Sequence, residues 1–144
     1  MVNAIVKAQL WTRDNRVEAA KLLSKDGENR YTPHAQQVLN RVLVPNAADR
    51  EQYLASGAIQ HSHWDERRID FQPYPFPSYT EELVKRLKDT LIEGDKGFLT
   101  NLDPQYTARD LVDDRFVRNA IAAVGGMKAF GLPEGFERRE EFGL

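Results

Sequence analysis

Apolar residues in the first half of the chain recur every three or four positions, the spacing of one face of an α-helix. Val2, Ile5, Val6 and Leu10 form the first such stripe and predict a helix over residues 2–12. Capping residues, prolines and glycines divide the rest of this half into three further helices. These run from Asp14 or Asn15 to Asp26-Gly27, from Thr32-Pro33 to Pro45, and from Asn46 to Gly57. We expect the first two helices to form a hairpin.

The second half of the chain contains the clearest helical pattern. Ser78 and Glu81 form an S-x-x-E capping box, and the pattern that follows predicts a helix as far as Gly94. Its expected buried stripe consists of Leu83, Val84, Leu87, Leu91 and Ile92. Two shorter helices are expected after it, from Asp103-Pro104 to Val112 and from Asp113 or Asp114 to Gly125-Gly126.

Between the two halves, about residues 58–77 show no clear period and predict a long irregular loop that crosses another surface. Ile59 and residues 69–71 are candidates for short strands. The pattern therefore predicts a mainly α fold with six or seven helices and at most one or two short strands. We expect a single helical domain over residues 1–144, in which residues 131–144 form a charged tail that lies on the surface or is mobile.

The stretch QPYPFPSYTEEL, at the end of this loop, holds three prolines and three aromatic residues within its first eight residues. A polyproline ligand, the edge of a binding cleft and a strap between two parts of the chain are the three alternatives. The prolines run directly into the capping box, which favours the strap. We expect Tyr74, Phe76 and Tyr79 to anchor it, while the prolines reduce the entropy lost when it is ordered.

Composition restricts the classes of protein and partner. The chain has 144 residues, of which 41% are hydrophobic and 29% charged, as in globular proteins. A net charge of −2 provides no basic surface for nucleic acid. No apolar run approaches the roughly 20 residues that span a bilayer, so we expect no direct membrane insertion. The first residues lack the regions of an export signal, and the absence of cysteine excludes disulfides and thiol nucleophiles.

One stretch, HSHWDE, has the composition of a metal site. His61 and His63 would lie on one face of an extended segment, and Asp65 or Glu66 would add a carboxylate. A zinc site needs three or four ligands, however, and the remaining histidine, His34, is expected on a distant helix. The alternative is a surface loop anchored by a tryptophan, and we expect no metal.

No pattern predicts catalysis. Two of the acidic pairs, Glu81-Glu82 and Asp113-Asp114, are explained by helix starts, where carboxylates favour the macrodipole. Gly125-Gly126 follows a helix, so it predicts a C-cap and no phosphate loop. Lys85, Arg86 and Lys88 are expected on a solvated helix face, and Trp11 is expected to be an anchor. No serine lies in a nucleophile motif. The four acidic pairs are Asp65-Glu66, Glu81-Glu82, Asp113-Asp114 and Glu140-Glu141.

Three stretches carry motifs in a characteristic order. AIVKAQLWTRDNRVEAAKLLS contains A-Q-x-W and then N-R-x-E-x-A-x-x-L-S; YPFPSYTEELVKRLKDTLIEG is an aromatic-proline-serine lead-in to a long helix; DPQYTARDLVDDRFVRNAIAAVG precedes GLP. Together they resemble the nitrate/bicarbonate-type (nitrate/sulfonate/bicarbonate) solute-binding proteins of ABC transporters. The matching positions in the first stretch are Ala8, Gln9, Trp11, Asn15, Arg16, Glu18, Ala20, Leu23 and Ser24.

The resemblance implies the C-terminal part of a two-lobed α/β periplasmic-binding-protein fold, and the uncapped helix at Met1 is expected of a truncation. It implies a non-catalytic, periplasmic or membrane-exterior component of an importer, with no cofactor. Its implied partners are a small oxyanion and the transporter permease and ATPase. The family's oxyanion-contacting residues lie mostly upstream of this region, so the resemblance assigns no ligand-binding residue to this chain.

Two alternatives remain open at this point. Residues Thr80 to Gly94 lack the tryptophan and the arginine-tryptophan-glycine ending of the family, which favours a cytoplasmic sensor or regulatory module, fused to a transporter ATPase or acting as an interaction domain. A metal-dependent enzyme built on His61 and His63 is the other. Apolar faces that would pack on missing lobes also predict that the isolated chain self-associates or repacks as a helical bundle.

Overall fold

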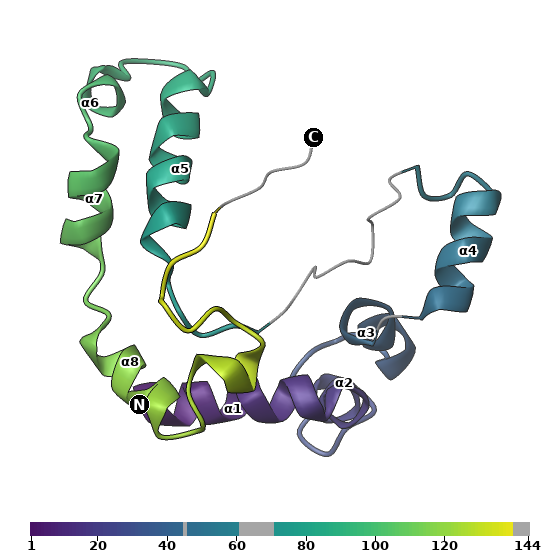
Figure 1. The fold of residues 1–144 in the computed structure, drawn as a ribbon. Helices are drawn as coiled ribbons and strands as arrows, with labels where there is room; N and C mark the ends of the chain where they lie inside the picture. The colour runs from purple at the N-terminus through teal and green to yellow at the C-terminus, as the bar shows by residue number, and fades with distance from the viewer. Residues whose placement is uncertain (45, 61–70, 140–144) are drawn as a thin grey trace. The chain divides into compact units, whose positions relative to one another are not determined.

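The computed structural model describes residues 1–44, 46–60 and 71–139. In these ranges the fold is mainly α, as expected, with eight α-helices, one short 3₁₀ helix and no strand (Figure 1). The elements are α1 (Val2–Asp14), α2 (Arg16–Leu23), α3 (Gln36–Leu43), α4 (Ala47–Ala55), α5 (Pro77–Asp89), α6 (Gly97–Thr100), α7 (Pro104–Leu111), α8 (Arg115–Ala122) and η1 (Met127–Phe130). No helix among the described residues combines the length and the apolar character that a membrane span requires.

The expected count of six or seven helices is one too low, because the pattern missed the four-residue helix α6. Ile59 and Phe71, the described members of the two strand candidates, belong to no strand. Residues 58–60 and 71–76, which are the described ends of the expected long loop, contain no helix. The rest of that loop lies outside the described residues.

The predicted start of α3 is wrong. The helix begins at Gln36 and not after Thr32-Pro33. The Gln36 N–H donates to Oδ2 of Asp26 at 3.0 Å, so a carboxylate ten residues earlier occupies the position expected for Thr32. Thr32 instead donates through its backbone N–H (3.0 Å) and its hydroxyl (2.9 Å) to the carbonyl of Leu23, the last residue of α2.

The predicted limits of α5 are also wrong at both ends. The helix begins at Pro77 with Phe76 as its N-cap, so Ser78 lies inside the first turn and cannot cap it. It ends at Asp89, five residues before Gly94. As a result Leu91 and Ile92 lie beyond the helix and are exposed, Leu91 to 96%. Of the expected stripe, Val84 is fully buried.

Several other predicted ends are confirmed. Asn46 caps α4 by accepting a hydrogen bond from the Ala48 N–H (3.1 Å), and Asp103 caps α7 by accepting one from Tyr106 (2.6 Å). Gly125 and Gly126 follow α8 with φ of 105° and 78°, a conformation that glycine adopts without a Cβ clash. Asn15 occupies the N-cap of α2, but its side chain donates to the carbonyl of Trp11 and makes no cap hydrogen bond.

Contacts between residues divide the chain, which we expected to be one domain, into two compact units. Unit 1 is Met1–Lys7 with Gln72–Leu144, and unit 2 is Ala8–Phe71. In unit 2, α2 packs against α3, so the predicted hairpin of the first two helices is wrong. Within the described part of unit 2, the buried residues are Ala19, Ala20, Ser24 and Leu43. The apolar pattern of α2 predicts Val17, Ala20 and Leu23 on its inner side; Ala20 is buried, whereas Val17 and Leu23 are exposed.

In unit 1, α5 and α7 lie side by side and antiparallel, with α6 in the connection between them (Figure 1). The yellow C-terminal segment of Figure 1 returns from η1 towards the start of α5. This unit contains the large buried side chains, and it contains the aromatic-proline lead-in to α5. Its buried residues are Val6, Tyr74, Phe76, Val84, Leu99, Ala108, Ala120, Ile121, Met127 and Phe130.

Candidate functional site

The metal candidates of the sequence are not brought together among the described residues. His61, His63, Asp65, Glu66 and Trp64 lie outside the described ranges. His34 was expected on a helix, but it lies before the start of α3. Its carbonyl accepts a hydrogen bond from the Lys25 N–H. Where the structure describes the chain, no three histidine and acidic side chains are grouped as metal ligands would be.

The acidic pairs in unit 1 bind neighbouring cations and a tyrosine. Glu81 and Glu82 fall after the first turn of α5, because that helix begins at Pro77. Glu82 pairs with Arg86 at 3.0 Å and with Lys85 at 3.8 Å. These exposed contacts agree with the solvated helix face predicted for the lysines and arginine. The second pair, Asp113-Asp114, is the start of the site described next, while Glu140-Glu141 lies outside the described residues.

Three polar side chains meet at the start of α8 and bind the lead-in to α5. The Tyr74 hydroxyl donates to Oδ2 of Asp114 (2.5 Å), and Arg118 donates through Nε to the same oxygen (2.7 Å) and through Nη2 to the Tyr74 oxygen (2.8 Å). Asp114 is the N-cap of α8, and Arg118 lies one turn later on the same face. We call these three residues the Tyr74 hub. It joins positions 40 and 44 residues apart.

The local sequence explains how the hub is presented. Side chains four residues apart on a helix are neighbours, so Asp114 and Arg118 form a fixed ion pair without help from elsewhere. Tyr74 is held from its own side by a hydrogen bond from its N–H to Oε1 of Gln72 (3.0 Å). Pro73 and Pro75 flank it and restrict the backbone. The tyrosine ring is fully buried as a result.

The hub fixes the protonation of its members. Burial, followed by its hydrogen bond to the Asp114 carboxylate, raises the pKa of Tyr74 to about 12. The hydrogen bond from Tyr74, together with that from Arg118, lowers the pKa of Asp114 below its usual value. Beside them, Arg115 lowers the pKa of the exposed Asp113 to about 2. At neutral pH the hub therefore holds a protonated phenol, a carboxylate and a guanidinium.

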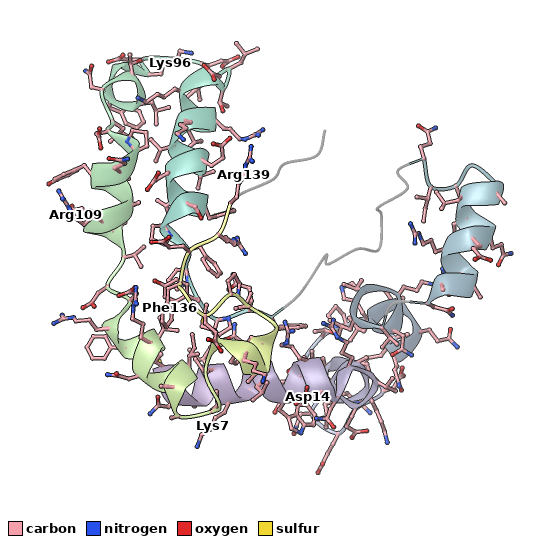
Figure 2. The ribbon with its side chains drawn as sticks, in the orientation of Figure 1. Lys7, Asp14, Lys96, Arg109, Phe136 and Arg139 are labelled. Atoms are coloured by element: carbon pink, nitrogen blue, oxygen red, sulfur yellow. The ribbon has the colours of Figure 1, made fainter. Side chains whose placement is uncertain are left out.

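An aromatic layer surrounds the hub. The rings of Tyr74 and Phe76 meet edge to face, with their centroids 4.9 Å apart. The Tyr74 ring also contacts the Phe136 ring, at a centroid distance of 4.8 Å. The Arg118 guanidinium lies 4.1 Å from the centre of the Phe136 ring, and the Arg138 guanidinium lies 4.3 Å from that of Phe76. Figure 2 labels Phe136 on the C-terminal segment, beside the lead-in to α5. Both contacts are cation–π interactions at short range.

Two open hollows border this cluster. One, of about 280 Å³, is lined by Arg118, Gly126, Met127, Lys128, Glu134 and Phe136 among others. The other, of about 300 Å³, lies along α7 and is lined by Pro75, Pro77, Glu81, Arg109, Val112 and Asp114 among others. Each is at the lower end of the size range of small-molecule sites. Their charged side chains are of both signs, which gives neither hollow a single-sign field for an ion.

The hub has the properties of a structural contact that holds two segments together. Its phenol is buried and its ionisation lies far above neutral pH, so it cannot exchange a proton with a substrate near pH 7. The strap prediction is confirmed for Tyr74 and Phe76, which are 0% and 1% exposed, and is wrong for Tyr79, which is 48% exposed. Trp11, predicted to be an anchor, is also exposed.

Sequence reasoning missed Asp114, Arg118, Phe136 and Arg138 as members of this cluster. One local signal was available for the first two, because an aspartate four residues before an arginine at a helix start predicts an ion pair. Nothing local connects them to Tyr74 or to the C-terminal segment. Comparison of the chain with models of protein families, with curated protein sequences and with solved structures finds no match.

Proposed function

We propose that this chain is a non-catalytic C-terminal part of the substrate-binding component of an ABC-type importer for small oxyanions of the nitrate, bicarbonate or sulfonate kind. The support is the order of the three motif stretches along the chain. Each stretch corresponds to a structural element: the first to α1 and α2, the second to the lead-in and α5, and the third to α7 and α8. The observation that carries the proposal is that the second and third stretches are tied to each other by the Tyr74 hub.

In this role the chain shapes a scaffold and does no chemistry. The oxyanion is bound between two α/β lobes upstream of this region, and their closure presents the loaded protein to the permease and ATPase. A buried aromatic strap suits this task, because a rigid segment transmits lobe position without binding ligand itself. The location is the periplasm or the outer side of the membrane. The protein requires no cofactor or metal in this role.

The second candidate is a sensor or regulatory module of the same family, fused to a transporter ATPase or acting as an interaction domain in the cytoplasm. It is favoured by α5 and the residues after it, where Thr80 to Gly94 carry no tryptophan. It is also favoured by the exposed apolar side chains of unit 1, such as Leu91, Phe98, Leu111 and Phe116, which suit a protein partner.

The experiment that tests the first proposal is to read the coding sequence upstream of Met1 and to purify the protein it encodes. An export signal and two α/β lobes are expected, whereas a Walker motif upstream would establish the second candidate instead. The encoded protein should show a higher Tm with nitrate, bicarbonate or a simple sulfonate at millimolar concentration, and an unchanged Tm with chloride as the control. No shift with any oxyanion would overturn the importer function.

The isolated 144-residue chain gives a second test of the scaffold role. Its exposed apolar side chains would be covered by lobes in the longer protein, so we expect the chain alone to self-associate or to repack as a helical bundle. Light scattering after size-exclusion chromatography measures this at micromolar concentration. A monomer that retains the Tyr74 hub would contradict the expectation.

A further inference from the structure

The C-terminal segment of unit 1, residues 131–139, lies against the rest of the unit as a peptide ligand would, with a turn at residues 134–135 and a bend at Phe136. Phe136 and Arg138, two residues apart, turn towards the aromatic layer, whereas Glu137 and Arg139 are exposed. The segment contacts its site through one ring and one guanidinium.

The surface under this segment is built without it. Tyr74 is oriented by Asp114, Arg118 and Gln72, and Phe76 packs on the Tyr74 ring at 4.9 Å and 85°. None of these contacts involves residues 131–139. Removal of the segment would leave these contacts in place and would uncover two aromatic faces and a guanidinium.

The site and the segment each contribute one cation and one aromatic ring, and each cation contacts the ring of the other. The site offers a cation, Arg118, which receives the Phe136 ring at 4.1 Å, and it offers an aromatic ring, Phe76, which receives the Arg138 guanidinium at 4.3 Å. The two subsites are matched by residues two positions apart in the sequence, the first of which lies at a bend of the backbone. This arrangement selects an aromatic residue followed two positions later by arginine.

Two backbone features of the segment favour its release from the site. Phe136 has φ of 56°, a left-handed conformation that disfavours a non-glycine residue. The segment begins at Gly131, with φ of 65°, a position at which glycine permits a change of chain direction. Lifting the segment from this hinge would relieve the strain at Phe136 without altering the Tyr74 hub.

We propose that the surface of Tyr74, Phe76 and Arg118 is a peptide-binding site for a segment of the form aromatic-x-Arg, and that residues 131–139 occupy it as an intramolecular ligand. A segment of the same chemistry, supplied by a partner protein, competes with the resident one. Because the resident segment is tethered, its effective concentration is about millimolar, so the free chain binds a competitor weakly. This inference does not depend on the importer function.

The experiment is a competition on the full chain. The probe is a fluorescein-labelled peptide of the resident sequence, GLPEGFERR, and its binding is measured by fluorescence anisotropy. It is titrated with the wild-type chain, with Phe136→Ala, and with Glu137→Ala, which alters an exposed neighbour. The control peptide carries alanine in place of the Phe136 and Arg138 equivalents.

Phe136→Ala weakens the resident segment and exposes the site, so we expect the probe to bind this variant about tenfold more tightly than the wild type or Glu137→Ala. The control peptide should bind none of them. Equal affinity of the probe for all three chains, absence of binding to Phe136→Ala, or binding of the control peptide would each overturn the proposal. If circular dichroism shows that Phe136→Ala is unfolded, Arg138→Ala replaces it with the same expectations.

Discussion

Unit 1 and unit 2 are both helical, yet they bury different kinds of side chain. Unit 1 buries Tyr74, Phe76 and Phe130, each at most 1% exposed. Among the described residues of unit 2, Ala20 and Ser24 are the least exposed, and Leu43 is the largest buried side chain. Large rings remove 150–250 Å² each from water, so apolar burial contributes far more to unit 1 than to unit 2.

The two units also differ in the sequence separation of the residues that hold them together. Unit 1 is tied by side chains far apart in sequence, from Tyr74 to Arg118. In unit 2 the loop between α2 and α3 is held by nearer partners: the Asp26 carboxylate accepts from the Gln36 N–H, and the Thr32 hydroxyl and N–H both donate to the carbonyl of Leu23. A longer-range hydrogen bond in this unit runs from Arg16 to the carbonyl of Leu43, 27 residues away. A short helical segment can therefore be ordered by one large buried side chain, as in unit 1, or by hydrogen bonds to backbone groups at its ends, as in unit 2.

The largest expected effect comes from Phe76→Ala, which removes the ring that packs on Tyr74 and receives Arg138. We expect a loss of about 3–5 kcal/mol in the free energy of unfolding, because a large cavity forms in unit 1. Tyr79→Ala, in the same segment but about half exposed, should cost less than about 0.5 kcal/mol. Urea denaturation measures both, and equal losses would contradict the anchor role of Phe76.

Asp114→Asn tests whether charge fastens unit 1. The pKa of Asp114 is lowered in the folded state, so its contribution is present above the unfolded pKa of about 3.9 and is lost as the pH falls through the lower folded value. Near neutral pH the substitution should cost about 1.5–3 kcal/mol, since two hydrogen bonds to a charged group weaken. Stability curves measured from pH 6 to pH 2 should be flatter for Asp114→Asn than for the wild type.

The phenol of the same hub gives the matching test at alkaline pH. The pKa of Tyr74 is raised to about 12, so its contribution is present below about pH 10 and is lost as the pH rises through 12. Absorbance of tyrosinate at 295 nm should show one of the five tyrosines ionising near pH 12. Tyr74→Phe should remove that late phase, and its persistence in Tyr74→Phe would assign the phase to another tyrosine.

In unit 2, Gly27→Ala tests how closely the loop packs on the end of α2. A Cβ at this position would lie 2.5 Å from the carbonyl oxygen of Lys21 and 2.8 Å from that of Leu22, both of which are backbone atoms. Overpacking of this kind costs roughly 1–3 kcal/mol. Gly135→Ala, which adds its Cβ to open space, is the matched control. Hydrogen exchange should show faster opening in unit 2 amides for Gly27→Ala alone.

The smallest effect is expected for Asp26→Ala, which removes the carboxylate that caps α3 from the preceding loop. Loss of a capping residue costs about 1 kcal/mol, and here it should appear as faster amide exchange in the first turn of α3. Glu28→Ala, an exposed acid in the same loop, is the control. If both variants exchange alike, Asp26 is not the cap.

Local chemistry was sufficient to predict part of the fold. Asp103 followed by Pro104 begins α7 as expected, and Gly125-Gly126 follows α8, because each depends on backbone groups within a few residues. Thr32-Pro33 has the same pattern as Asp103-Pro104 but begins no helix. Asp26 and the carbonyl of Leu23 take the hydrogen bonds in that loop, and a pattern read over four residues does not include them.

Burial was less predictable than helix position. The apolar pattern predicted Val17, Ala20 and Leu23 on the inner side of α2, but of these three Ala20 alone is buried, together with Ala19. The face of a helix that is buried depends on its packing partner, and α2 packs on α3 rather than on α1. A stripe shows that one side of a helix is apolar, but two neighbouring helices decide how much of that side is covered.

By itself, the sequence determined the mainly α fold, the approximate positions of most helices and the anchoring role of Tyr74 and Phe76. These follow from periodicity, from capping residues and from the cost of leaving two aromatic rings between prolines in water. Only the tertiary structure decided that Asp114 and Arg118 bind the Tyr74 hydroxyl and that Phe136 and Arg138 cover the rings. Those contacts join residues forty or more positions apart, and their energy depends on distances in space that no local pattern encodes.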